Sequence, residues 1–231
     1  MLDAAARAFV SMGAVVSVSA TGENLVRRRA VPLTGVEVQA QGLPNLLHEL
    51  VHALLAGRLD DDHGFDYAKI PYDLASGPGR AVLWDELAAC ALSCTYLRAS
   101  LCHHPDREIG AEEIDAIADA WFVEQVEIQP VFYGMEDDPP AFVAAVGALL
   151  RAHAQEADAF VAHAQARLAR ALTEAGAESK LAEPGPCESL AAIWARTMQA
   201  SSPAQTEAQT EAMTEAMTEG ADRRRLRAAP G

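Results

Sequence analysis

The sequence predicts an α+β protein, mostly α, in which a small N-terminal β-sheet is followed by a helical domain. Half of the 231 residues are hydrophobic and only 6% are aromatic, and helix-forming residues dominate, which favours helices over a β-sandwich or barrel. Valine-rich segments near the N-terminus have the high β-propensity that indicates strands. The length suits one domain, residues 1–200, and the change of composition after residue 200 predicts a low-complexity tail, residues 201–231.

The predicted sheet comprises three segments that turn-forming residues separate. Residues 8–20 also resemble the core of a signal peptide, but Asp3 precedes them and Arg7 is the one positive charge nearby, so a strand is the better interpretation. The three predicted strands are residues 14–19, 26–32 and 36–40.

Apolar residues then recur at helical spacing in several segments. The first covers residues 43–57, with Pro44 in its first turn and Gly57 near its end, as is typical of helix boundaries. Residues 60–79 contain an acidic run and several turn formers, so we predict an irregular segment with one edge strand at residues 67–72. The remaining predicted helices are residues 80–102, 113–127, 139–175 and 188–200.

The tail contains a Thr-Glu-Ala unit that begins at Thr206 and recurs from Thr210 and Thr214. A period of four residues is too short for a solenoid repeat. We therefore expect a weakly helical or disordered tail, with a partner-binding arm as the alternative.

The net charge of -15 and the pI near 4.8 argue against a nucleic-acid partner, because phosphate binding depends on Lys and Arg. The four cysteines form no Cys-x-x-Cys pair, which is typical of reduced intracellular thiols. No stretch approaches the ~20 consecutive apolar residues of a membrane span. We expect a soluble, cytoplasmic protein without a membrane or nucleic-acid partner, and the sequence leaves the oligomeric state open.

A metal-binding pattern lies in the helix predicted for residues 43–57. Its sequence is His48-Glu49-Leu50-Val51-His52, the H-E-x-x-H motif. Residues four apart lie about 40° apart around a helix and ~6 Å along it, so both imidazoles can reach one cation. Two histidines without partners would be costly among the apolar residues of this helix, which favours a metal site over histidines satisfied within the core. We expect Zn²⁺ as the cofactor, with Glu49 beside a water whose pKa the ion lowers toward ~7 and whose proton Glu49 accepts.

The third ligand must come from another segment, because a catalytic zinc ion usually has three protein ligands. The extended motif that supplies a histidine six residues after His52 does not fit, since that position is Arg58. Glu86, on the next strongly helical segment, would complete a set of two histidines and one glutamate. The alternatives are a solvated Glu86 and a ligand from His63 or from the acidic residues 60–62.

With the H-E-x-x-H motif followed by a helix that bears Glu86, residues 36–98 resemble the gluzincin group of zincin metallopeptidases. The resemblance implies a zincin-like helical domain in which His48, His52 and Glu86 bind zinc and Glu49 is the general base.

One position departs from the pattern of that group. Many members carry an aspartate four residues after the ligand glutamate, where it orients a ligand histidine, and this chain has Cys90 there. The orienting group would then be Asp85, Asp62 or a backbone carbonyl. For Cys90 and Cys94 we expect packing between helices, with a thiolate ligand as the alternative.

A hydrolase also needs a hydrogen-bond donor for the oxyanion that develops during the reaction. We name His63 and Tyr72 as the catalytic candidates, with Tyr67 and the more distant Tyr133 beside them. The structural alternative for each is a half-buried tyrosine ring or a solvated histidine.

These expectations define a zinc metallopeptidase that cleaves a peptide bond in a peptide or protein substrate. The alternative from another class is a zincin-like interaction or regulatory module with a non-catalytic zinc ion, which would not need Glu49. A third possibility is other chemistry with iron, since two histidines and one carboxylate also bind that metal.

Overall fold

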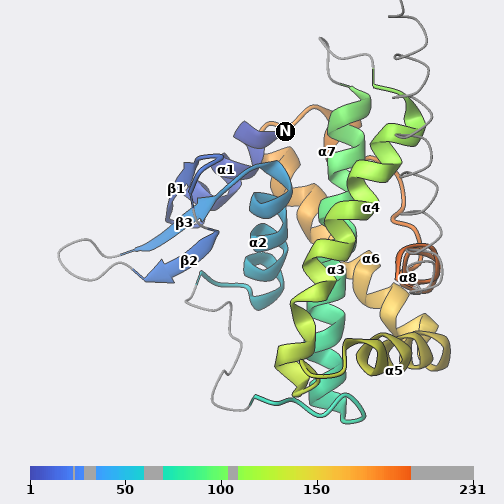
Figure 1. The fold of residues 1–231 in the computed structure, drawn as a ribbon. Helices are drawn as coiled ribbons and strands as arrows, with labels where there is room; N and C mark the ends of the chain where they lie inside the picture. The colour runs from blue at the N-terminus through green and yellow to red at the C-terminus, as the bar shows by residue number, and fades with distance from the viewer. Residues whose placement is uncertain (23, 29–34, 60–69, 104–108, 199–231) are drawn as a thin grey trace, which may run out of the picture.

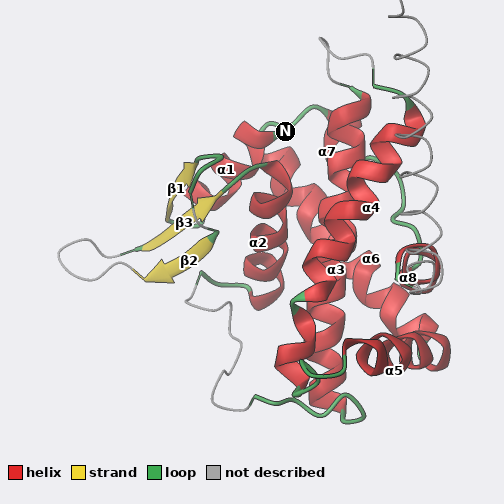
Figure 2. Ribbon diagram, in the orientation of Figure 1, coloured by secondary structure: helices red, strands yellow, loops and turns green. Residues whose placement is uncertain are grey.

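The computed structural model describes residues 1–22, 24–28, 35–59, 70–103 and 109–198, and these residues form helices around one small sheet (Figure 1). The protein is α+β and mostly α, as predicted, with the sheet at one side of the helices (Figure 2). The predicted tail lies outside the described residues. The elements in chain order are α1 (Leu2–Ser11), β1 (Ala14–Val18), β2 (Leu25–Arg28), β3 (Val36–Ala40), α2 (Leu43–Ala56), α3 (Gly77–Cys102), α4 (Ala111–Glu127), the 3-10 helix η3 (Gln129–Tyr133), α5 (Pro139–Ala152), α6 (Ala154–Glu174), α7 (Ser179–Ala182) and α8 (Leu190–Thr197).

A helix precedes the sheet, so the expectation that the domain begins with strands is wrong. The buried side chains of α1 include Ala5 and Phe9, which recur at helical spacing. The apolar run at residues 8–20 therefore divides between the end of α1 and strand β1. None of the helices in the described ranges is both long and apolar enough to cross a membrane.

Strand β3 is the centre of the sheet, parallel to β1 and antiparallel to β2. Val36, Val38 and Ala40 are buried and alternate with half-buried residues, so one face of β3 packs against the core. On the other face Arg27 of β2 forms a 3.1 Å ion pair with Glu37 of β3.

Helix α2 begins three residues after β3 ends, and its boundaries agree with the prediction. Pro44 occupies its first turn, and Gly57 ends it in the left-handed conformation (φ 69°) that favours glycine. In Figure 1, α2 lies between the sheet and the long helix α3. This position puts the H-E-x-x-H helix inside the core.

Helix α3 starts at a capped turn, where the Ser76 hydroxyl accepts a hydrogen bond from the backbone N–H of Gly79 (3.0 Å). The predicted edge strand at residues 67–72 is not found at residues 70–72, which are the part of it that the structure describes. There the N–H of Tyr72 donates instead to the carbonyl of Phe132 (2.8 Å), which ties the segment before α3 to η3.

The single helix predicted for residues 139–175 is two helices, α5 and α6, which meet at His153. The backbone of His153 leaves the helical region (φ -125°, ψ 28°). No proline or glycine marks this break in the sequence. Helix α5 packs mainly against α8, whereas α6 packs mainly against α2 and α3 and also meets α8. The break therefore reflects tertiary packing rather than a local signal.

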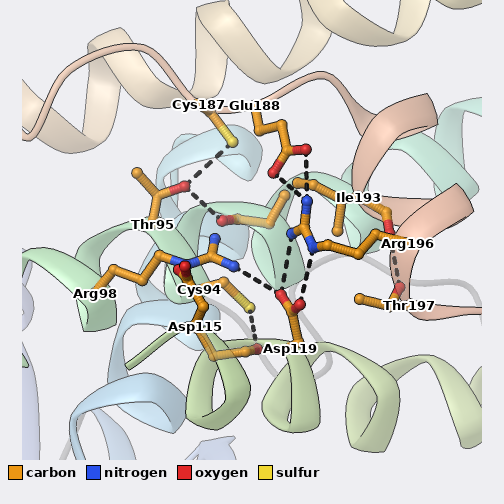
Figure 3. Close-up of polar contacts among 12 residues, drawn as sticks. Cys94, Thr95, Arg98, Asp115, Asp119, Cys187, Glu188, Ile193, Arg196 and Thr197 are labelled. Atoms are coloured by element: carbon orange, nitrogen blue, oxygen red, sulfur yellow. Dashed lines mark hydrogen bonds and ion pairs between the residues drawn. The ribbon is translucent and has the colours of Figure 1, made fainter. Parts of the chain in front are cut away.

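The last described helix is held by a cluster of ion pairs (Figure 3). Arg196 of α8 donates to Asp119 of α4 (2.8 and 3.0 Å) and to Glu188 (2.6 and 2.7 Å). Arg98 of α3 donates to the same Asp119 (2.6 Å) and to Asp115 (2.9 Å). Asp119 thus joins three helices.

Candidate metal centre

The two histidines of the motif lie on the buried face of α2. Nε2 of His48 and Nε2 of His52 are 3.0 Å apart, and the rings meet edge to face with their centroids 4.7 Å apart. Apolar side chains on the same face, such as Leu47 and Val51, hold the helix in the core. The helix therefore turns one nitrogen of each ring toward a shared point, which is the geometry that the four-residue spacing predicts.

Glu86 of α3 faces the same point. Its carboxylate oxygens are 3.7 Å from Nε2 of His48 and 3.6 Å from Nε2 of His52. The three residues are only 8%, 4% and 8% exposed in the order His48, His52 and Glu86. Among the residues that the structure describes, they form a group of ligand atoms close enough to hold one metal ion.

The spacing of these three candidate ligands is close to that of three ligands on one tetrahedral metal ion. Ligand atoms bound at ~2.0–2.2 Å in tetrahedral geometry lie about 3.3 Å from one another. The two Nε2 atoms are 3.0 Å apart, and each lies 3.6 or 3.7 Å from a different oxygen of the Glu86 carboxylate, so the separations are close to that value. Side-chain shifts of a few tenths of an ångström would bring the three groups onto one ion.

Asp85, the neighbour of Glu86 on α3, binds the other side of the His52 ring. Nδ1 of His52 donates a hydrogen bond to the Asp85 carboxylate. In the neutral ring, this bond would leave the lone pair of Nε2 directed toward His48 and Glu86. Of the three orienting groups considered from the sequence, the structure places Asp85 in contact with the ligand histidine, while Asp62 lies outside the described residues.

The centre is rich in negative charge for its depth in the protein. Burial by itself lowers the pKa of His52, but the carboxylates of Glu86, Asp85 and Glu49 outweigh burial and raise that pKa. Burial raises the pKa of Glu86, and Asp85 and Glu49 raise it further while His52 opposes them. Three acidic groups around two imidazoles leave a deficit of positive charge, which a divalent cation would supply.

Glu49 is the third of these acidic groups and is half-buried beside the ligands on α2. It lies within electrostatic reach of both His52 and Glu86, and it is not part of the group of ligand atoms. A carboxylate placed beside a metal site without belonging to the ligand set is suited to accept a proton there.

The remaining candidates from the sequence, for the oxyanion donor and for the third ligand, fall into two groups. His63, Tyr67 and the acidic residues 60–62 lie outside the described residues. Tyr72 and Tyr133 are described, and their ring centroids are 6.4 Å apart. Tyr72 is half-buried and packs against the core, whereas Tyr133 is buried with 7% of its surface exposed.

The thiols near the centre are packing groups. Cys90 accepts a hydrogen bond from Nε2 of Gln129 (3.5 Å), and Cys94 donates to the carbonyl of Ala118 (3.1 Å). Burial raises the pKa of the Cys90 thiol well above its usual value and that of Cys94 to about 12. Both side chains are buried, and neither belongs to the described group of ligand atoms, which agrees with the packing interpretation. Gln129 has no part in the sequence interpretation, because its proximity to Cys90 depends on how η3 folds back on α3.

Comparisons with models of known protein families, with curated proteins and with solved structures found no match to this chain.

Proposed function

We propose that this protein is a zinc-dependent hydrolase, and specifically a metallopeptidase of the H-E-x-x-H type. The observation that carries the proposal is the buried group formed by His48, His52 and Glu86, with the carboxylate of Glu49 beside it. Two histidines and one carboxylate are a ligand set of catalytic zinc sites, which keep one position open. The resemblance of residues 36–98 to zincin metallopeptidases points to the same reaction.

The residues of the chain would divide the work of peptide hydrolysis. When bound, zinc polarises the scissile carbonyl and lowers the pKa of water at the site. Glu49 accepts the proton of the attacking water and passes it to the leaving amine. Asp85 keeps the His52 ring in the tautomer and orientation that a ligand needs. The substrate is a peptide or protein, and no nucleic acid or membrane takes part.

The same cluster could serve two other functions, a non-catalytic zinc site and iron chemistry. The presence of Glu49 argues against the first of these. A zinc site that serves protein interaction or regulation does not need a carboxylate beside the ligands, so Glu49 favours the enzyme. Iron chemistry would use the same two histidines and Glu86. The identity of the bound metal distinguishes iron chemistry from zinc-dependent peptide hydrolysis.

The first experiment is therefore the metal content of the full chain, with zinc and iron both measured by mass spectrometry. We expect about one zinc ion per chain in the wild type, none in the His48→Ala, His52→Ala double variant and a strong loss in Glu86→Ala. The exposed His163 of α6 offers the matched control, His163→Ala, which should retain the metal.

Each contrary result has its own meaning. If the wild-type protein neither contains nor takes up metal, the H-E-x-x-H sequence is a chance match in a buried helix. Iron in place of zinc would overturn the peptidase assignment and leave the centre intact. Unchanged zinc affinity in Glu86→Ala would remove Glu86 from the ligand set.

A further inference from the structure

Strand β1 forms one border of the sheet, and the outer edge of this strand is unpaired among the described residues. There β1 pairs with β3 alone, whereas β3 has a strand on each side. The N–H of Ser19, directly after β1, donates to the carbonyl of Ala40 of β3 (3.0 Å). Because successive residues of a strand direct their backbone groups to opposite sides, those of Val15 and Ser17 also face β3. The residues whose N–H and C=O groups face outward are Ala14, Val16 and Val18.

The open edge of β1 lacks the features that usually keep an edge strand from pairing with another chain, which are charged side chains, prolines or a covering element. The strand reads Ala-Val-Val-Ser-Val, without a charge or a proline. Val15 and Val18 point to opposite faces of the sheet, and both are exposed (48% and 39%). Neither face is therefore fully covered along this border by the residues that the structure describes. The other border, β2, carries the charge of Arg27.

Exposed apolar side chains also occur on the helix that packs against β1. Among the described residues, the exposed large hydrophobic side chains form two groups. The first group belongs to α1 and β1 and comprises Leu2, Val10, Val15 and Val18. The second belongs to α4, η3 and the residue between them and comprises Ile117, Ile128 and Val131. Because α1 packs against β1 at one side of the molecule (Figure 1), the first group extends the apolar surface of the strand, as is typical of a protein contact.

The open edge is complementary to a second copy of itself. If two β1 strands pair antiparallel around a two-fold axis at Val16, this residue meets its own counterpart and Ala14 meets Val18. The outward-facing backbone groups of both strands are then paired by roughly six hydrogen bonds. Val15 lies opposite Ser17, so no charged side chains oppose each other. A basic partner, which the net charge of -15 would attract elsewhere, finds no charge on this edge.

We propose that the protein forms a symmetric dimer in which the β1 edges of two copies pair antiparallel and join their sheets into one. The strand order across the dimer is β2-β3-β1-β1-β3-β2, with the apolar residues of α1 beside the contact. Hydrogen bonds and apolar contacts hold the strands together, whereas the charge of -15 on each copy repels the other copy. Dimerisation is therefore favoured by salt, which screens the repulsion and leaves the uncharged edge unaffected.

The test is sedimentation equilibrium of the full chain over a wide range of protein and salt concentrations. Val15→Lys places a charge at the open edge. The matched control is Val131→Lys in η3, because Val131 has the same exposed fraction of 48% and belongs to the second apolar group. Circular dichroism and melting temperatures check that both variants are folded.

We expect a reversible dimer in the wild type, with a dissociation constant that falls as salt rises. Val15→Lys should raise that constant at least about 10-fold, since two added charges come close together across the axis. Val131→Lys should leave the constant unchanged. A wild type that stays monomeric at every concentration would overturn the proposal, and so would a dimer that Val15→Lys does not weaken.

A second measurement tests the register and does not depend on the loss of an interaction. Residues 15 and 17 of opposite copies form a non-hydrogen-bonded pair, whose Cα atoms lie ~4.5 Å apart, within the range of a disulfide bond. In a Cys102→Ser background, which lacks the exposed thiol, a mixture of Val15→Cys and Ser17→Cys should cross-link faster under mild oxidation than either variant alone. Equal rates would contradict the antiparallel pairing. Neither measurement needs metal or hydrolysis, so the dimer and the proposed function fail independently.

Discussion

Asp85 binds Nδ1 of His52, on the far side of the imidazole from the nitrogen that faces His48. Asp85 and Glu86 are consecutive residues of α3, so one short stretch supplies both the third candidate ligand and the group that would orient His52. Consecutive helical residues point about 100° apart, and His52 is placed so that each carboxylate meets a different edge of its ring.

Asp85→Ala should weaken zinc binding by about 10- to 100-fold, because the ring of His52 loses the partner that fixes its tautomer. Competition with a chromophoric chelator measures the change. Asp115→Ala provides the control, since Asp115 is an exposed acid of α4 that pairs with Arg98. If both variants bind zinc as the wild type does, the contact between Asp85 and His52 has no role in the centre.

Glu49→Gln should keep wild-type metal content while hydrolysis falls by at least 100-fold, because an amide cannot accept the proton of the attacking water. A peptide library with metal-loaded protein is the assay, and Glu124→Gln, at an exposed position of α4, is the matched control. Turnover at the wild-type rate in Glu49→Gln would show that another group is the base.

Asp119→Asn should lower the free energy of unfolding by about 1–2 kcal/mol, because it removes the charge that Arg98 and Arg196 share at a partly exposed site. Urea unfolding at low and high salt checks this, and the effect should shrink as salt rises. The exposed Asp137 supplies the comparison through Asp137→Asn. Equal losses in the two variants would mean that the ion pairs of Figure 3 add nothing to stability.

The cysteines should differ sharply in their reaction with a thiol reagent at neutral pH. The reactive form is the thiolate, and burial raises the pKa of Cys90, Cys94 and Cys187, which keeps their thiols protonated. Cys102 is exposed. One thiol should therefore react quickly in the native protein and four in denaturant, and Cys102→Ser should abolish the fast phase. Rapid reaction of a second thiol would contradict the packing described here.

The sequence predicted those parts of the fold that depend on local signals. The boundaries of α2 follow from Pro44 and Gly57, and the reach of His48 and His52 toward one point follows from helical geometry alone. The break at His153 has no local signal, because alanine-rich segments on both sides favour a continuous helix. The tertiary packing of α5 and α6 accounts for the break.

In the candidate site, too, local sequence signals predicted some residues and the tertiary structure was needed for others. Glu86 could be proposed from its helix and the chemistry of a third ligand, but the choice of Asp85 over other orienting groups required the distance between two helices. The contact between Gln129 of η3 and Cys90 of α3 depends on how the chain turns after α4. No pattern within residues 129–133 records which part of α3 they meet.

The candidate ligands come from two helices, α2 and α3, that pack directly on each other within one hydrophobic core. An ion held by both would join them as a cross-link does, and it would bind the folded chain far better than the unfolded one. Each metal would then stabilise the fold according to its own affinity. At a free concentration 100 times its dissociation constant, the free energy of unfolding would rise by about 2.7 kcal/mol, and the unfolding temperature would rise with it. A melting series over several divalent cations would thus rank the metals for this protein before any substrate is known.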